Sequence, residues 1–468
     1  MSNVHSEPDP LPNQPAPAAV SPRVLWFTLL VLFGINTVNF YDRQVVGAIG
    51  EHVRNEWELT DTQLSSLTTA FILLYAAVGL PLGRWADVGK RKLILATGVL
   101  VWSVMTAVSG LAASFGMLFV CRLGVGVGEA SCAPAANSLL GDLFPPEKRG
   151  RAIGFFMLGL PLGLALSHIV SGEIAQALSW RAALFVAGAP GLILGIMALW
   201  LPEPPRGAAD VAAPHPPLPP LSKGGTQGGG TGASAVMSIL RIPTMWWIIL
   251  SGALQNLVMY ALFSFLVSFL MRFHGLSIKD ANWLNGLAVG IGGSVGMLGG
   301  GWLCDRVRRR SVSGRLLVGA ASMLLATPCF WLALEIPRGA GLAFAALLLP
   351  AYVFVYVYYA SVYATIQDIV APTLRGTAMA VYFFVFYLFA AAGLYAFGWL
   401  SDHLAQTART AHALSAPEAR AVGLHQALYV VPALLALLAL VLFAAARTVT
   451  ADQRRRPGKT HVGSPNRD

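Results

Sequence analysis

The chain has 468 residues, of which 56% are hydrophobic and only 12% are charged. Since a water-soluble domain carries roughly 25% charged residues, this composition excludes an ordinary soluble protein and predicts a polytopic membrane protein. The net charge of +10 does not indicate a nucleic-acid partner, because the basic residues gather in short loops on one side of the predicted spans.

Twelve apolar segments of membrane-spanning length follow one another along the chain. A transmembrane helix needs roughly 20 apolar residues, and clusters of charged and turn-forming residues separate the segments. The first six spans are predicted near residues 24–48, 62–83, 93–112, 117–141, 151–175 and 181–201. The second six are predicted near residues 244–270, 280–303, 315–335, 340–366, 376–400 and 424–446. We therefore predict an all-α integral membrane protein with twelve transmembrane helices in two pseudo-symmetric six-helix bundles.

The segments outside the spans complete the expected domain organisation. The bundles are assigned to residues 23–201 and 241–447, and residues 202–240 are predicted to form a linker because they include a stretch rich in Pro and Gly. Residues 1–22 and 448–468 are expected to be disordered tails. The first tail lacks the basic start of a signal peptide, so the first span is expected to be retained.

Lys and Arg residues are concentrated in the loops that share a side with the linker and both termini. Basic loops mark the cytoplasmic side of a membrane protein. The linker and both termini are therefore expected to be cytoplasmic, in a multi-pass protein of a bacterial inner membrane.

Two loop motifs occur once in each half of the chain. GRWADVGKRK at 83–92 aligns with GWLCDRVRRR at 301–310, and GDLFPPEKRGRA at 141–152 aligns with QDIVAPTLRGTA at 367–378. An aspartate in such a loop can accept hydrogen bonds from a helix N-terminus and pair with a neighbouring arginine, which would close the cytoplasmic side. The alternative is that these are simple basic loops. The predicted gating residues are Gly83, Asp87, Arg91, Asp305, Arg309, Arg149 and Arg375.

This duplication, with G-x-x-x-D and a basic cluster after the second span of each half, resembles the major facilitator superfamily. Within it, NFYDRQ at 39–44, CRLGVGVGEASCAPA at 121–135 and EPPRG at 203–207 resemble the Spinster family of lipid transporters. The anion:cation symporter family shares the Asp-Arg pair and the GEA motif. The first loop departs from the superfamily pattern at Val88, where a basic residue usually stands. The resemblance implies a secondary transporter that works by alternating access.

Four ionisable residues with zero net charge lie inside the first and fourth spans: Asp42, Arg43, Arg122 and Glu129. Charges at such depth are costly unless they face one another or a cavity. We expect Arg43 and Arg122, with Asn39 on the same helix stripe as Arg43, to bind an anionic substrate. Asp42 or Glu129 would then carry a coupling proton. The alternative is a static set of salt bridges between the two spans.

Further candidate residues lie in other spans. His168 is a candidate for the proton path, although a hydrogen-bonded packing role is the commoner use of a buried histidine. Tyr356, Tyr359 and Tyr363 recur at helical spacing in the tenth span and are candidates to line an amphipathic substrate site. Ordinary interhelical packing explains the tyrosines almost as well.

The chain is therefore expected to be a proton-coupled transporter of an amphiphilic anionic lipid of the lysophospholipid or sphingoid-phosphate type. A proton-driven symporter of a small organic or sugar-acid anion is the alternative. An enzyme is not expected, because the chain has no complete nucleotide-binding P-loop and no H-E-x-x-H motif. We expect a monomer in the lipid bilayer, without cofactor, metal or nucleic acid, whose partners are the substrate and protons.

Overall fold

The computed structural model describes residues 21–144, 146–205, 208, 232–370 and 374–454. Within these residues all regular structure is helical and twelve helical segments are long and apolar enough to span a membrane. The first half contains α1 (Pro22–Trp57), α2 (Asp61–Val88), α3 (Arg91–Ser109), α4 (Phe115–Glu129), α5 (Cys132–Leu143), α6 (Pro146–Met157), α7 (Gly159–Ala177) and α8 (Trp180–Ala198). The second half contains α11 (Pro243–His274), α12 (Ile278–Arg308), α13 (Gly314–Leu334), α14 (Gly341–Ile369), α15 (Arg375–His412), α16 (Ala416–Leu428) and α17 (Val430–Arg454). The predicted fold class is confirmed.

Three spans consist of two helices each, and proline explains each break. Ala130 and Ser131 separate α4 from α5, Leu158 separates α6 from α7, and Tyr429 separates α16 from α17. A proline stands three residues after each break, at Pro134, Pro161 and Pro432. Since proline has no N–H to donate and its ring crowds the preceding turn, the helix is interrupted there. The first of these breaks ends α4 directly after Glu129.

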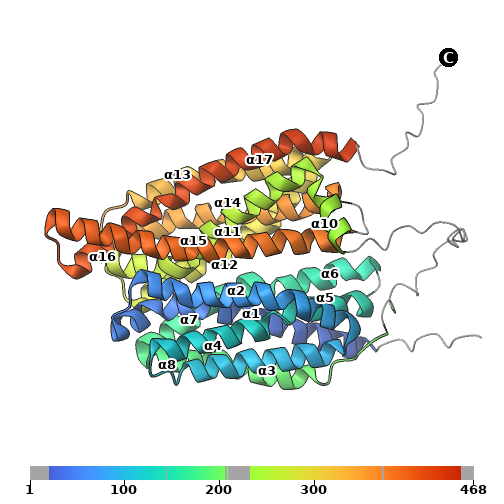
Figure 1. Ribbon diagram of the computed structural model, residues 1–468, viewed down its shortest axis with the longest axis horizontal. Helices are drawn as coiled ribbons and strands as arrows, with labels where there is room; N and C mark the ends of the chain where they lie inside the picture. Colours follow the sequence, from blue (N-terminus) through green and yellow to red (C-terminus); the bar gives the residue numbers. More distant parts are fainter. Residues whose placement is uncertain (1–20, 145, 206–207, 209–231, 371–373, 455–468) are drawn as a thin grey trace, which may run out of the picture.

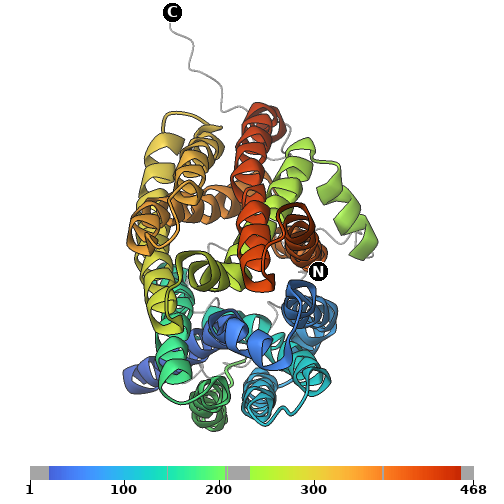
Figure 2. The ribbon, with the colours of Figure 1, turned by 90° about the vertical axis from the view of Figure 1, so that its left-hand side faces the viewer.

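The two bundles lie side by side with their helices running along a common axis (Figure 1). The start of α1 and the end of α17 lie at the same end of the molecule, which we call the linker end. The opposite end, where the α15–α16 turn projects in Figure 1, is called the far end. Viewed from the far end, the first half forms one layer and the second half the other (Figure 2).

The outer surface is apolar, as lipid contact requires. Six exposed tryptophans lie near the linker end, a position typical of the interface between membrane and water: Trp26, Trp85, Trp200, Trp246, Trp247 and Trp302. A short helix, α10 (Gly232–Leu240), lies within the predicted linker, and the indole N–H of Trp246 donates to the Leu240 carbonyl at 2.8 Å. The described chain also extends the last helix to Arg454, into the segment predicted to be a tail.

Small residues let helices approach closely inside each bundle. A Cβ atom added at Gly292 or Gly296 of α12 would collide with the backbone of α14, and one added at Gly128 would collide with α3. These glycines are therefore packing residues. The run from Gly292 to Gly296 also spells G-x-S-x-G, but it lies in a continuous helix and not in the strand-turn-helix of hydrolases.

Candidate functional site

The centre of the first half holds a buried ion pair between the first and fourth spans. Arg43 of α1 donates from Nε to Oε2 of Glu129 at 2.8 Å, and the two side chains are 11% and 0% exposed. Glu129 occupies the last position of α4, directly before the proline-induced break. The sequence analysis placed both residues inside membrane spans, and the structure brings their side chains into contact.

Aromatic rings surround the Arg43 guanidinium. Its central carbon lies 4.4 Å from the centre of the Tyr75 ring and 5.2 Å from that of Phe40. Nη1 also donates to the hydroxyl of Tyr387 at 3.4 Å, so Arg43 contacts α15 of the second half. Aromatic faces stabilise a desolvated cation. Arg43 is thus held by both halves, and Tyr75 is a site residue that the sequence analysis missed.

Asp42 and Arg122 are buried beside this pair but do not bond to each other. The hydroxyl of Thr106 donates to Asp42 Oδ2 at 3.3 Å, while Asp42 Oδ1 and Arg122 Nη1 have no hydrogen-bond partner among the described residues. The two side chains are 0% and 2% exposed. A buried polar atom without a partner is costly. This site therefore contains one buried salt bridge, Arg43–Glu129, and beside it donor and acceptor atoms available to a ligand or a proton.

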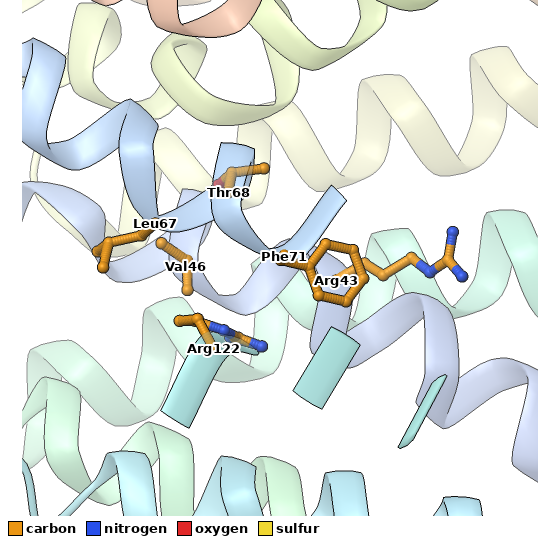
Figure 3. Close-up of a pocket in the computed structure, with 6 residues that line it drawn as sticks. All are labelled: Arg43, Val46, Leu67, Thr68, Phe71 and Arg122. Carbon is orange, nitrogen blue, oxygen red and sulfur yellow. The ribbon is translucent and has the colours of Figure 1, made fainter. Parts of the chain in front are cut away.

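A small cavity opens beside the arginines. Its wall is formed by Arg43, Val46, Leu67, Thr68, Phe71 and Arg122 (Figure 3). The cavity has a volume of about 10 Å³, close to the smallest that holds one water molecule. A larger substrate would therefore need the surrounding helices to separate.

Asn39 lies one helical turn before Arg43 on α1, as the sequence pattern indicated. Its side chain is 3% exposed and lies beside Glu129, and its Nδ2 atom forms no hydrogen bond within the described chain. Asn36, in contrast, donates from Nδ2 to the carbonyl of Phe156 at 2.8 Å. Asn39 thus remains a candidate donor to a substrate, whereas Asn36 has a structural role.

His168 lies between the two halves. Its Nδ1 is 2.8 Å from Asn282 Oδ1 and its Nε2 is 3.0 Å from Asn285 Nδ2, both on α12. The amide oxygen requires a proton on Nδ1 and the amide nitrogen requires a lone pair on Nε2, so this arrangement suits a neutral ring. No carboxylate bonds to His168 among the described residues, and its role in a proton path stays a prediction.

The tyrosine series on α14 divides into two groups. Tyr356 is 1% exposed, and its ring lies within 3.4 Å of where a Cβ on Gly293 would be, so it packs against α12. Tyr359 and Tyr363 are partly exposed, with ring centres 5.6 Å apart. That these tyrosines line a substrate site therefore stays a prediction. The greater exposure of Tyr359 and Tyr363 favours this role for them more than for the buried Tyr356.

Arg91 joins three segments at the linker end of the first half. It donates to Asp142 at the end of α5 and, from Nε, to Glu203 at 2.8 Å. The backbone N–H of Lys92 donates to the other Glu203 oxygen at 2.9 Å. Partial burial alone would raise the pKa of Glu203, but these donors hold it below its ordinary value. All these bonds lie within the first half.

Arg315 is the counterpart of Arg91 in the second half. It lies at the start of α13, as Arg91 lies at the start of α3, and donates to Asp368 at 2.7 Å and to Asp305 at 2.8 Å. Arg309, which the sequence alignment paired with Arg91, is exposed at the end of α12 and has no ion pair within the described chain. Arg315, and not the aligned Arg309, therefore takes the place of Arg91 in the second half, because the loop between α12 and α13 is longer than the loop between α2 and α3. The gating role of Arg309 stays a prediction.

The remaining predicted gating residues lie outside the residues whose side chains the structure describes: Gly83, Asp87, Arg149 and Arg375. Their gating role stays a prediction. Across the part of the chain that is described, no cluster of three His, Cys, Asp or Glu side chains could hold a metal ion.

Comparisons with known proteins agree with this architecture. The family model of the Major Facilitator Superfamily matches residues 32–394. An MFS-type efflux pump of Mycolicibacterium smegmatis is 30% identical over 385 residues, which cover 82% of this chain and 86% of the pump. Protein spinster homolog 3 of Danio rerio is 29% identical over 431 residues, covering 87% of this chain and 82% of that protein.

The solved structure of a bacterial homolog of the human lysosomal transporter Spinster, in an inward-facing and unoccupied conformation, is also similar. It has a TM-score of 0.80 and 28% identity, covering 92% of this chain and 99% of that chain. The chain belongs to the Major Facilitator Superfamily and is a Spinster-like, multi-pass membrane transporter rather than an enzyme.

Proposed function

We propose that this transporter moves an amphiphilic anionic lipid, of the lysophospholipid or sphingoid-phosphate type, in a cycle coupled to proton movement. The observation that carries the proposal is the buried Arg43–Glu129 pair with unpartnered atoms of Asp42 and Arg122 beside it. A site of this kind can bind an anion and lose a carboxylate charge in the same step.

The proposed coupling is a competition for Arg43. An anionic headgroup that pairs with the Arg43 guanidinium displaces Glu129, which would leave an unpaired charge in a buried site. Protonation removes that charge and its desolvation cost. Arg122, whose Nη1 has no partner among the described residues, provides a second donor for the headgroup, and Asp42 is the second candidate to carry the proton. Substrate and proton would then occupy the site together or leave it together.

Several features support a lipid rather than a small anion. The partly exposed rings of Tyr359 and Tyr363 offer both apolar faces and hydroxyl groups, which suits a molecule with an acyl chain and a polar head. The similarity to Spinster proteins is consistent with the lipid substrates that the sequence resemblance implied. We further propose that the protein acts as a monomer in a bacterial inner membrane with both termini and the linker in the cytoplasm.

The test is transport into liposomes that contain the purified protein. A fluorescent lysophospholipid, a sphingoid phosphate and a sugar acid are each offered with and without an imposed proton gradient. The expected result is gradient-dependent movement of one of the lipids, lost on Arg43→Ala and retained on Glu58→Gln, which changes an exposed carboxylate just after α1. Accumulation of the sugar acid alone would instead establish the small-anion symporter.

A further inference from the structure

The outer face of α12 leads from the lipid-facing surface to a group of arginines at the linker end. Ile291, Val295, Leu298 and Trp302 follow one another at helical spacing, and each side chain is at least 50% exposed. An exposed apolar stripe on a membrane-spanning helix contacts the hydrocarbon of the bilayer. Since tryptophan prefers the boundary between hydrocarbon and headgroups, Trp302 marks the depth at which the lipid headgroups begin.

Three exposed arginines lie just beyond Trp302 on the same face. Arg306, Arg309 and Arg310 stand four, seven and eight residues after it. The backbone N–H of Arg310 donates to the Val307 carbonyl at 2.9 Å, so the helical turn continues past the end of α12. At 3.6 residues per turn, the three arginines and the tryptophan project within an arc of about 100 degrees. We call Arg306, Arg309 and Arg310 the α12 arginine cluster.

A ring contact fixes one member of the cluster on the lipid side. The guanidinium carbon of Arg306 lies 5.4 Å from the centre of the Trp302 ring. An arginine at a membrane edge lays its stem along apolar surface and keeps its charge at the level of the headgroups. The cluster therefore faces the lipid headgroups, and it is separate from the site around Arg43 and Glu129.

The carboxylates close to the cluster already have other partners. Arg308 donates to Asp368 at 3.1 Å, and Arg315 donates to Asp368 at 2.7 Å and to Asp305 at 2.8 Å. Within the described residues, the α12 arginine cluster forms no ion pair. Five arginines and two carboxylates thus leave three positive charges here. Like charges three and four residues apart on a helix repel each other, so this surface lacks an anion.

We propose that the α12 arginine cluster and Trp302 bind the headgroup phosphate of an anionic phospholipid in the leaflet at the linker end. A guanidinium matches a phosphate group with two parallel hydrogen bonds, and basic clusters beside a membrane span attract anionic lipids. The exposed apolar stripe of α12 is at hand for the acyl chains. A soluble anion would use the arginines alone and leave this stripe without a role, which favours the lipid.

The test measures how much phospholipid the purified full chain binds. The protein is stripped of lipid, equilibrated with detergent micelles that contain fluorescent phosphatidylglycerol or phosphatidylcholine, and recaptured. The wild type should bind phosphatidylglycerol at least tenfold more tightly than phosphatidylcholine, and excess inorganic phosphate should displace little of it. The double change Arg306→Gln and Arg310→Gln should lower the affinity for phosphatidylglycerol at least tenfold, since each arginine near an anionic surface contributes about fivefold. Both side chains are exposed, so this variant should fold like the wild type.

Arg447→Gln is the matched control. Arg447 is also exposed and lies over an exposed ring, 4.7 Å from the centre of Phe443, but no other arginine stands within six residues of it. Its loss should leave the affinity for phosphatidylglycerol within twofold of the wild type. Binding at the proposed transport site would persist in all these variants, so the difference between the wild type and the double variant does not depend on the proposed function.

Four results would overturn the proposal. The first is a double variant that binds phosphatidylglycerol as tightly as the wild type does. The second is equal affinity of the wild type for the two lipids, and the third is an equal loss of affinity in Arg447→Gln, which would show a general effect of positive charge. The fourth is displacement of the lipid by inorganic phosphate, which would show a site for a soluble anion.

Discussion

The change of Glu129 to Gln separates two roles that the wild-type residue would combine. Glu129 accepts from Arg43 Nε at 2.8 Å, and both groups are buried. Glutamine keeps the size and a carbonyl oxygen that can still accept this bond, but it removes the negative charge and the capacity to take up a proton. Under the proposed competition, the variant should bind an anionic lipid more tightly and yet fail to couple its movement to protons.

The size of the effect follows from the environment of Arg43. Removal of one member of a buried ion pair costs roughly 3–5 kcal/mol. The retained hydrogen bond and the Tyr75 ring recover part of this, which leaves the empty site destabilised by about 2 kcal/mol. An anionic headgroup restores the missing charge when it binds. Since about 1.4 kcal/mol corresponds to a tenfold change, the affinity for the lipid should rise roughly 10- to 30-fold.

The assay has a binding part and a transport part. Titration of the detergent-solubilised protein with a fluorescent lysophospholipid gives the affinity of the wild type, Glu129→Gln and the control Glu58→Gln. In liposomes, Glu129→Gln should keep the exchange of labelled for unlabelled lipid but lose accumulation driven by a proton gradient. If Glu129→Gln instead weakens binding as much as Arg43→Ala does, Glu129 serves to position Arg43 and the pair is a static salt bridge.

Hydropathy predicted every span, because contact with lipid imposes an apolar run of fixed minimum length. It misplaced the end of the first span, which was expected near residue 48, whereas α1 continues to Trp57. The helix continues because Glu51 and Arg54 bond to each other and Glu51 also bonds to Arg272 of the other half. Nothing local in the sequence shows that a charge at the end of a span has a partner more than 200 residues later, so the contact between Glu51 and Arg272 could not be foreseen.

The central site was predictable in composition but only partly in its contacts. The sequence analysis placed Arg43 and Glu129 inside the first and fourth spans, and the structure brings the two side chains into contact. Asp42 and Arg122 lie in the same two spans but form no ion pair among the described residues. Neighbouring residues on a helix point about 100 degrees apart, so Asp42 does not share the direction in which Arg43 meets Glu129. Tyr75 was missed because one tyrosine in an apolar run carries no signal of the cation it faces.

Three further predictions address positioning, stability and pH. Tyr75→Phe should keep the affinity for lipid within about threefold, whereas Tyr75→Leu should lower it about tenfold. The reason is that the ring face that orients Arg43 contributes roughly 1–2 kcal/mol to binding. The fluorescence titration described above measures both affinities. Arg315→Ala should lower the unfolding free energy by roughly 1–2 kcal/mol through the loss of two charged hydrogen bonds. The control is Arg309→Ala, which changes an exposed arginine of the same loop and should unfold at the same temperature as the wild type. An equal Tm for the two variants would contradict the assignment of Arg315. The pKa of Glu203 is held below its ordinary value, so the Glu203 carboxylate binds a proton more readily in the unfolded chain than in the folded one. Its stabilising effect is then fully present above the ordinary pKa of about 4.3 and is lost as the pH falls through the lower folded value. Glu203→Gln should therefore unfold at a lower temperature than the wild type at pH 7, and this difference in unfolding temperature should shrink as the pH is lowered below about 4. A difference in unfolding temperature that stays constant down to pH 3 would show that the carboxylate charge contributes nothing to the Arg91 contact.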